Sequence, residues 1–287
     1  MRHSIALRVG PIGFRVGSDW RAPIAQLEIL YRDYPKPHDD IPHFTVRLEA
    51  TMRWRRFIRP SVAILGDHVI PEALPLPLAQ GLLAAEMAMN LQVALGERRF
   101  LLLHASSVER DGKVLIMTGE SGSGKSTLAA LLGENGWRLL GDEFALIEPE
   151  TGMAWPFPRP VSLKNASIEV MAAHVEASRF GPLLRGTPKG DVRHLIPNVM
   201  ALRNMDSPAP TALILFPRFG AEAAVREMGA SEVFIRLTQA STNYVALAER
   251  GYAALARLVT ETPVRAFDFP DTAAGLALVE QLWGELA

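Results

Sequence analysis

The stretch Gly119-Glu120-Ser121-Gly122-Ser123-Gly124-Lys125-Ser126-Thr127 decides the fold of this chain. It fits the phosphate-binding pattern G-x-x-x-x-G-K-[ST], known as Walker A. An apolar run, Val114 to Met117, precedes it and predicts a strand, while the leucines after it predict a helix. Glycines let such a loop curl so that its N–H groups face a phosphate. The alternative is a Gly- and Ser-rich turn that only caps a helix.

Two side chains of this stretch have separate expected roles. Lys125 is a mobile cation for the β- and γ-phosphates of a nucleoside triphosphate, and the Ser126 hydroxyl is a Mg²⁺ ligand. The helix N-terminus adds a partial positive charge. We therefore predict that residues 119–127 bind the nucleotide and that Lys125 also takes part in catalysis.

Asp142 and Glu143 follow an apolar segment, Trp137 to Leu140, that predicts the next strand. The carboxyl end of a strand in an α/β sheet lies beside the phosphate loop. One carboxylate could hold Mg²⁺, and the other could take a proton from an attacking hydroxyl. The alternative is a pair of solvated acids in a turn.

His104 lies in Phe100 to Val108, which is predicted to be one buried strand before the loop. A lone histidine in an apolar strand is usually a core residue with satisfied hydrogen bonds. It could instead orient a carboxylate or the acceptor, so it remains a candidate catalytic residue.

A later segment, 178–191, is rich in Gly, Pro, Lys and Arg and is predicted to be a loop. With Lys164-Asn165 it offers cations, and phosphoryl transfer benefits from one more positive charge on the γ-phosphate. Lys189 is the favoured candidate, because Pro188 and Gly190 shape the backbone around it. An ordinary solvated loop is the alternative.

The composition limits the function classes. The chain has 287 residues, 48% of them hydrophobic, and a net charge of -1, so nothing global indicates nucleic-acid or membrane binding. It has no cysteine, which excludes disulfides and thiolate metal sites and fits a cytoplasmic location. No signal peptide is evident at the start, and no uninterrupted apolar run of about 18 residues predicts a membrane span.

The first part of the chain is predicted to be a small, mostly antiparallel sheet with one helix. Strands are expected around Ile5–Val9, Phe14–Val16, Phe44–Leu48, Trp54–Ile58 and Val62–Leu65, and the helix at 23–34. The segment Arg53 to Arg59 is the most basic in the chain. It could clamp an acidic partner or stack on nucleic acid, or it could be the charged outer face of an edge strand.

The rest of the chain alternates helices and strands. A helix at 78–95 is expected to pack on the nucleotide-domain sheet. Further helices are expected at 166–175, 231–237 and 243–259, strands at 211–216, 224–228 and 264–269, and a last helix capped by Asp271.

Three motifs together resemble a known family. His104-Ala105, Gly119 to Ser126, and Gly136-Trp-Arg-Leu-Leu-Gly-Asp142-Glu143 resemble the catalytic core of HPr kinase/phosphorylase, where a strand histidine precedes the loop and a second strand leads to an acidic pair. The whole chain is similar to the HPr kinase-related kinase A group. That likeness includes Trp54-Arg-Arg, Thr187-Pro-Lys-Gly190 and the closing Leu282-Trp283 helix.

The resemblance implies a P-loop kinase domain of the HPr kinase/PEP carboxykinase-like type, at 76–287, with a small N-terminal α+β domain at 1–75. It implies ATP and Mg²⁺ as cofactors and a serine hydroxyl as acceptor. Ser126 and Asp142 would serve the metal and Glu143 would be the base. The second acid is usually Asp in that family, and the Glu-Val-Arg-Gly signature of the phosphorylase reaction is not evident.

Two functions of different classes remain open. The first is an ATP- and Mg²⁺-dependent kinase of a peptide, a protein or a small molecule with a hydroxyl, acting without nucleic acid or membrane and compatible with a homo-oligomer. The second is a nucleotide-binding switch or scaffold that binds ATP without transfer. A motor ATPase or a GTPase is less favoured, because the chain lacks a Leu-Ser-Gly-Gly-Gln-like signature and an Asn-Lys-x-Asp motif.

Overall fold

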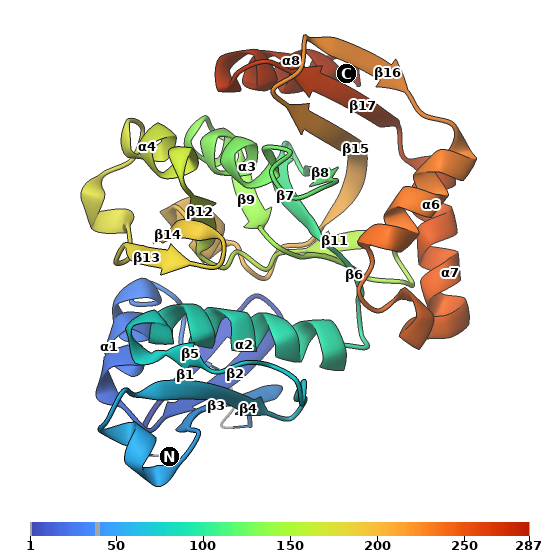
Figure 1. Cartoon of the computed structure of the whole chain (residues 1–287). Helices are drawn as coiled ribbons and strands as arrows, with labels where there is room; N and C mark the ends of the chain where they lie inside the picture. Colours follow the sequence, from blue (N-terminus) through green and yellow to red (C-terminus); the bar gives the residue numbers. More distant parts are fainter. Residues whose placement is uncertain (1, 38–40, 287) are drawn as a thin grey trace. The chain divides into compact units, whose positions relative to one another are not determined.

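A computed structural model describes residues 2–37 and 41–286 and shows a mixed α/β protein with several sheets. Contacts divide it into two compact units. Unit 1 comprises residues 1–97, 162–168 and 176–196, and unit 2 comprises 98–161, 169–175 and 197–287. Each unit is described by itself (Figure 1).

Unit 1 contains a sheet in the order β1-β2-β3-β4-β5, in which only the pair β2–β3 is parallel. This confirms the mostly antiparallel sheet predicted from sequence. Apolar side chains at alternate positions face the core, as in Ile12, Phe14 and Val16. The strands are β1 His3–Val9, β2 Ile12–Ser18, β3 Phe44–Ala50, β4 Ser61–Gly66 and β5 Leu76–Pro77, and the first helix is α1 Arg21–Leu30.

Helix α2, Gly81–Gly96, packs on β3, β4 and α1. It was expected to pack on the nucleotide-domain sheet, so unit 1 extends beyond the range 1–75 expected for the small domain. With the short 3₁₀ helix η2, Leu78–Gln80, it forms the one segment of the described chain that is long and apolar enough to cross a membrane. Half of that segment is buried, as is common for the core helix of a folded domain.

Two predicted segments of unit 1 have a different structure. The basic segment forms a 3₁₀ helix, η1 Arg53–Arg56, rather than a strand, because the Trp20 indole donates to the Arg56 carbonyl and holds the turn. The predicted loop contains a 3₁₀ turn and a hairpin, and a neighbouring strand completes a sheet in the order β12-β14-β13. These elements are β12 Val161–Lys164, η3 Ala177–Arg179, β13 Leu184–Thr187 and β14 Gly190–Leu195.

Unit 2 is built on a sheet with β8, Lys113–Thr118, near its centre. The path is β6-β10-β11-β15-β8-β7-β9, and β17 pairs with β15 and β16. The strands are β6 Leu101–Leu103, β7 Ala105–Arg110, β9 Arg138–Gly141, β10 Ala145–Ile147, β11 Met153–Trp155, β15 Ala209–Phe219, β16 Ala224–Glu227 and β17 Val264–Phe269. The strand predicted at 100–108 is therefore broken at His104.

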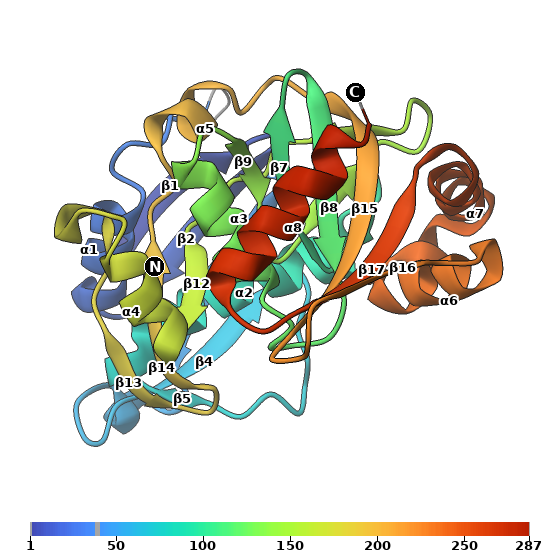
Figure 2. The ribbon, with the colours of Figure 1, turned by 90° about the horizontal axis from the view of Figure 1, so that it is seen from above.

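Helices cover both faces of this sheet (Figure 2). Helices α3 and α8 lie side by side on one face. Val114 and Ile116 of β8 instead join a core cluster with Leu237 and Leu255, which come from α6 and α7 on the other face. The helices of unit 2 are α3 Lys125–Glu134, α5 Val199–Arg203, α6 Ala230–Ala240, α7 Tyr244–Glu261 and α8 Thr272–Gly284, and helix α4, Ala166–Ala172, has residues in both units.

Candidate functional site

The glycine-rich loop leaves the carboxyl end of β8 and enters α3 at Lys125, as the sequence predicts. Its three glycines have positive φ angles of 144°, 84° and 93° at Gly119, Gly122 and Gly124. At Gly124 space is also limiting, since a Cβ there would lie 2.8 Å from Cζ of the Phe269 ring. The last turn of the loop therefore requires glycine for its backbone angle and for its packing.

The Lys125 side chain is folded into this loop and is only 7% exposed. Its Nζ donates to the carbonyl oxygens of Gly119 at 2.8 Å and Glu120 at 2.7 Å, and to the Ser123 hydroxyl at 3.3 Å. Ser126 and Thr127 follow in the first turn of α3 and are half-buried. The loop thus holds its ammonium group against its own carbonyl oxygens, and the Ser126 hydroxyl follows at the start of α3.

The acidic pair lies at the same edge of the sheet. Strands β8 and β9 are both antiparallel to β7, so they run in the same direction, and Asp142 follows the end of β9 directly. One strand separates them, which sets their backbones roughly 10 Å apart. That separation is within reach of side chains directed at one shared ion.

Asp142 is held by the intervening strand. It is 5% exposed, and its Oδ1 accepts a hydrogen bond of 2.5 Å from the Ser106 hydroxyl of β7. Ser106 pairs in register with Met117 of β8, one residue before the end of that strand. The carboxylate is therefore anchored one strand away from the start of the loop.

Glu143 has a left-handed backbone with φ of 80°, which is uncommon for a residue with a side chain. Such angles cost about 1–3 kcal/mol and occur often at functional sites. The Glu143 carbonyl bonds with His104 Nδ1 at 3.1 Å, and Thr118 Oγ1 donates to the His104 carbonyl at 3.0 Å. A hydrogen-bonded chain thus joins the last residue of β8 to Glu143 through His104.

A carbonyl oxygen can only accept, so Nδ1 carries the proton of the His104–Glu143 bond. The break between β6 and β7 places His104 here, and its backbone N–H donates to the Ala240 carbonyl at 2.8 Å. His104 is therefore a linking residue of the acidic side rather than an isolated core residue.

Lys189 belongs to the other unit of the chain. It is exposed on the β13–β14 hairpin of unit 1, where its backbone N–H donates to the Thr187 hydroxyl at 3.2 Å. The phosphate loop belongs to unit 2. A contact between Lys189 and a nucleotide therefore stays a prediction.

A pocket of 710 Å³ opens beside the loop on its other side. It is lined by loop residues 119–123 and by residues of β15, β16, β17 and α6, among them Phe219, Arg218, Arg226, Arg236 and Asp268. Sequence analysis did not identify these residues, because no motif joins positions so far apart in the chain.

The arginines of this pocket are paired with acids. Arg218 Nε donates to Asp268 Oδ1 at 3.0 Å. Arg226 makes two bonds of 2.8 Å to Glu232, and Arg236 lies 3.0 Å from the same carboxylate. The bond from Arg226 lowers the pKa of Glu232 and raises that of Arg226. Two guanidinium groups thus share one carboxylate.

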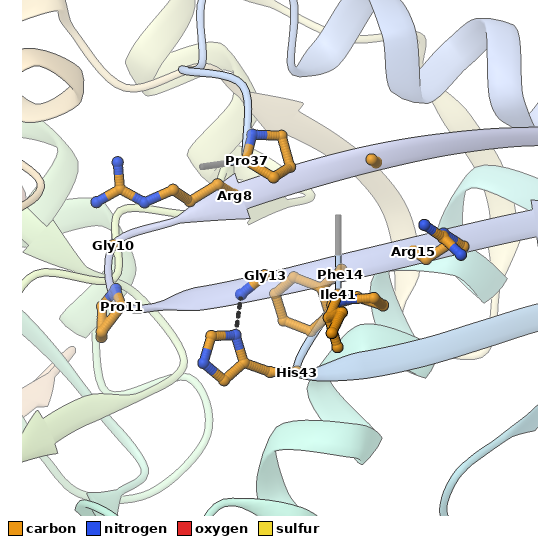
Figure 3. Close-up of a pocket in the computed structure, with 11 residues that line it drawn as sticks. Arg8, Gly10, Pro11, Gly13, Phe14, Arg15, Pro37, Ile41 and His43 are labelled. Atoms are coloured by element: carbon orange, nitrogen blue, oxygen red, sulfur yellow. Dashed lines mark hydrogen bonds between the residues drawn. The ribbon is translucent and has the colours of Figure 1, made fainter. Parts of the chain in front are cut away.

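Unit 1 has a separate pocket of 240 Å³ on the outer side of β1 and β2 (Figure 3). The Gly13 N–H donates to His43 Nδ1 at 2.9 Å. Arg8 of β1 pairs in register with Gly13, and Arg15 lies two residues further along β2. The described lining residues include none of the predicted catalytic residues.

No protein-family model matches this sequence, and no curated protein is similar enough to count as a match. Among solved structures, this chain is similar to the Hpr(Ser) kinase/phosphatase from Coxiella burnetii. The sequence identity is 14%, the alignment covers 64% of this chain and 98% of that one, and the TM-score is 0.30. A TM-score of 0.30 assigns neither a fold nor a function to this chain.

Proposed function

We propose that this protein is a kinase that transfers the γ-phosphate of ATP to the hydroxyl of a serine or a similar acceptor in a peptide, protein or small molecule. One observation carries the proposal: the Walker A loop and the acidic pair lie at one edge of one sheet. The bonds Thr118–His104–Glu143 and Ser106–Asp142 hold them there. Solvated acids in a turn would not require such anchoring.

Lys125 and the loop amides would bind the triphosphate. The ammonium group now bonds to the loop carbonyls of Gly119 and Glu120, and phosphate oxygens would replace these acceptors. The carbonyl bonds keep the cation inside the loop until a phosphate oxygen replaces these acceptors.

The residues present fit a magnesium ion bound with the nucleotide. No group of three His, Cys, Asp or Glu side chains in residues 2–37 and 41–286 could hold a metal by itself. Mg²⁺ commonly takes one or two protein oxygens and completes its shell with phosphates and water. Ser126 and Asp142 would supply those oxygens, and the ion when bound would neutralise charge on the β- and γ-phosphates.

Glu143 is the proposed base. Its carboxylate would take the proton of the acceptor hydroxyl while the hydroxyl oxygen bonds to the γ-phosphorus and the bond to the β-phosphate oxygen breaks, releasing ADP. His104 is a positioning residue, since its Nδ1 bonds to the backbone of Glu143 and fixes that backbone beside the loop. Lys125 would balance the charge that develops on the transferring group.

The test is transfer of label from γ-labelled ATP to lysate peptides, with the labelled molecule identified by mass spectrometry. Lys125→Ala should lose ATP binding and transfer, whereas Glu143→Gln should bind ATP and lose transfer by about 10²- to 10⁴-fold. The matched controls are Lys113→Ala, an exposed lysine on β8, and Glu148→Gln, and both should keep the wild-type rate.

Glu143→Gln transferring at the wild-type rate would remove the base assignment. Tight ATP binding by the wild type with no labelled acceptor would favour the nucleotide-binding switch instead. Wild-type protein that binds no nucleotide would contradict both functions.

A further inference from the structure

We propose that the pocket between the phosphate loop and the ends of β15, β16 and β17 binds the nucleoside end of the nucleotide, with the Phe219 ring stacked on the base. This proposal rests on the proposed function, because it assumes that the loop binds a triphosphate. The side of the loop that carries Arg218, Arg226 and Arg236, here called the arginine side, has no role in the transfer step proposed above.

The direction of the triphosphate follows from the order of the strands. Strand β8 feeds the loop, with β7 and β9 on one side of it and β15 and β17 on the other. The acidic pair that would act on the γ-phosphate follows β9. A linear triphosphate with its γ end on that side extends its α-phosphate and nucleoside over β15. The pocket lies on this second side.

The pocket has the size and the contacts that such a group needs. Ligand sites commonly enclose about 300–1,000 Å³, and this one measures 710 Å³ and begins at loop residues Gly119–Ser123. Three arginines lie beside the pocket together with three acids: Asp268 accepts from Arg218, Glu232 pairs with Arg226 and Arg236, and Glu120 belongs to the loop. A guanidinium group has five N–H donors, more than these pairs use, so the arginines can also donate to the α-phosphate and the ribose oxygens of a nucleotide.

Phe219 supplies an aromatic surface at the wall of this pocket. Its side chain is 51% exposed, although it is a large apolar group. Its ring meets the buried Phe269 ring edge-on, with centroids 5.6 Å apart and planes at 65°. Phe269 in turn lies against Gly124 of the loop. Phe219 is thus fixed next to the loop while much of its surface remains accessible to a planar ligand.

The neighbouring strand supplies the matched control. Ala224 and Arg226 of β16 line the pocket, whereas Val225 between them does not and is 43% exposed. Successive side chains of a strand point to opposite faces, so Val225 points away from the pocket. Val225→Ala therefore removes exposed apolar surface of the same unit without changing the proposed subsite.

The experiment compares the binding of ATP with that of inorganic tripolyphosphate by calorimetry. Phe219→Ala should weaken ATP binding roughly tenfold, the effect of losing one base–aromatic stack, and leave tripolyphosphate binding unchanged. Phe219→Trp should keep ATP binding within about threefold of wild type. Val225→Ala should change neither ligand. Circular dichroism of each variant shows that it is folded.

The outcomes separate this proposal from the proposed function. If the wild type binds both ligands and Phe219→Ala weakens the binding of both equally, Phe219 has only a structural role and the proposed subsite is wrong. If Phe219→Ala weakens the binding of neither ligand, Phe219 has no role and the proposed subsite is again wrong. If Phe219→Trp fails to restore selective ATP binding, stacking is wrong. If the wild type binds neither ligand, the proposed function itself fails and this proposal fails with it.

Discussion

The two sides of the phosphate loop are built in opposite ways. On the β9 side, Asp142 is buried and bonded to Ser106, and Glu143 is joined to the loop strand through His104. On the β15 side, Arg218, Arg226 and Arg236 are exposed and Phe219 is half exposed. The acidic side is held by hydrogen bonds within the sheet, whereas the arginine side is exposed to a ligand. We expect the acidic side to take part in phosphoryl transfer and the arginine side to bind the nucleotide.

The largest expected effect on stability comes from substituting Gly124, the loop residue that lies against Phe269 of β17. Gly124→Ala places a Cβ 2.8 Å from the Phe269 ring at a φ of 93°. Strain and overpacking together should lower the free energy of unfolding by roughly 2–4 kcal/mol. Urea denaturation measures this change.

The control for Gly124 lies near the other end of the same helix. A Cβ at Gly133 would meet Leu139 at an ordinary 3.8 Å. Gly133→Ala should therefore raise the free energy of unfolding by about 0.5–1 kcal/mol, because alanine suits a helix interior better. Equal effects of the two substitutions on the free energy of unfolding would show that the Phe269 ring does not restrict the side chain at position 124.

A smaller effect is expected on the acidic side. Ser106→Ala removes the hydrogen bond to the buried Asp142 carboxylate, which should cost roughly 1.5–3 kcal/mol of unfolding free energy. Ser231→Ala, at an exposed position of the same unit, should stay within about 0.5 kcal/mol of wild type. A change as small as that control at Ser106 would mean that Asp142 does not depend on its anchor.

The smallest effect concerns Glu232 on the arginine side. The Arg226 bond lowers the pKa of Glu232 below its usual 4.5, so the pair stabilises the fold above that pH and loses its contribution as pH falls through the lowered pKa. Glu232→Gln should therefore lower Tm slightly at pH 7, and the difference should vanish at the acid end of a pH series. A difference that persists there would show that the carboxylate charge is not its cause.

Local patterns predicted the parts of the site that are local in the chain. The strand–loop–helix around Gly119–Thr127 and the Asp271 cap, whose Oδ1 accepts from Ala274 N–H at 2.9 Å, are confirmed as structure. Asp142 and Glu143 follow a strand as predicted. The break at His104 was missed, because the two halves of one apolar run pair with different strands: β6 with β10, and β7 with β8 and β9.

The missed features depend on contacts between distant residues. The basic segment at Trp54–Ile58 was predicted to be a strand, but contacts of Arg56 with Asp19 and Trp20 hold it in a 3₁₀ turn. Helix α2 is apolar over much of its surface, so its sequence does not indicate which sheet it covers. The arginine pocket joins residues from three strands and a helix, and only the folded sheet brings them together.

The central claim is that the loop and the acidic pair form one metal–nucleotide site, and Mn²⁺ tests it directly as a paramagnetic substitute for Mg²⁺. Electron paramagnetic resonance measures free Mn²⁺ with ATP and either wild type, Asp142→Asn or the exposed control Glu222→Gln. We predict that Asp142→Asn binds the Mn²⁺–ATP complex at least about tenfold more weakly than the other two. Equal binding by all three proteins would contradict a metal shared between the loop and Asp142.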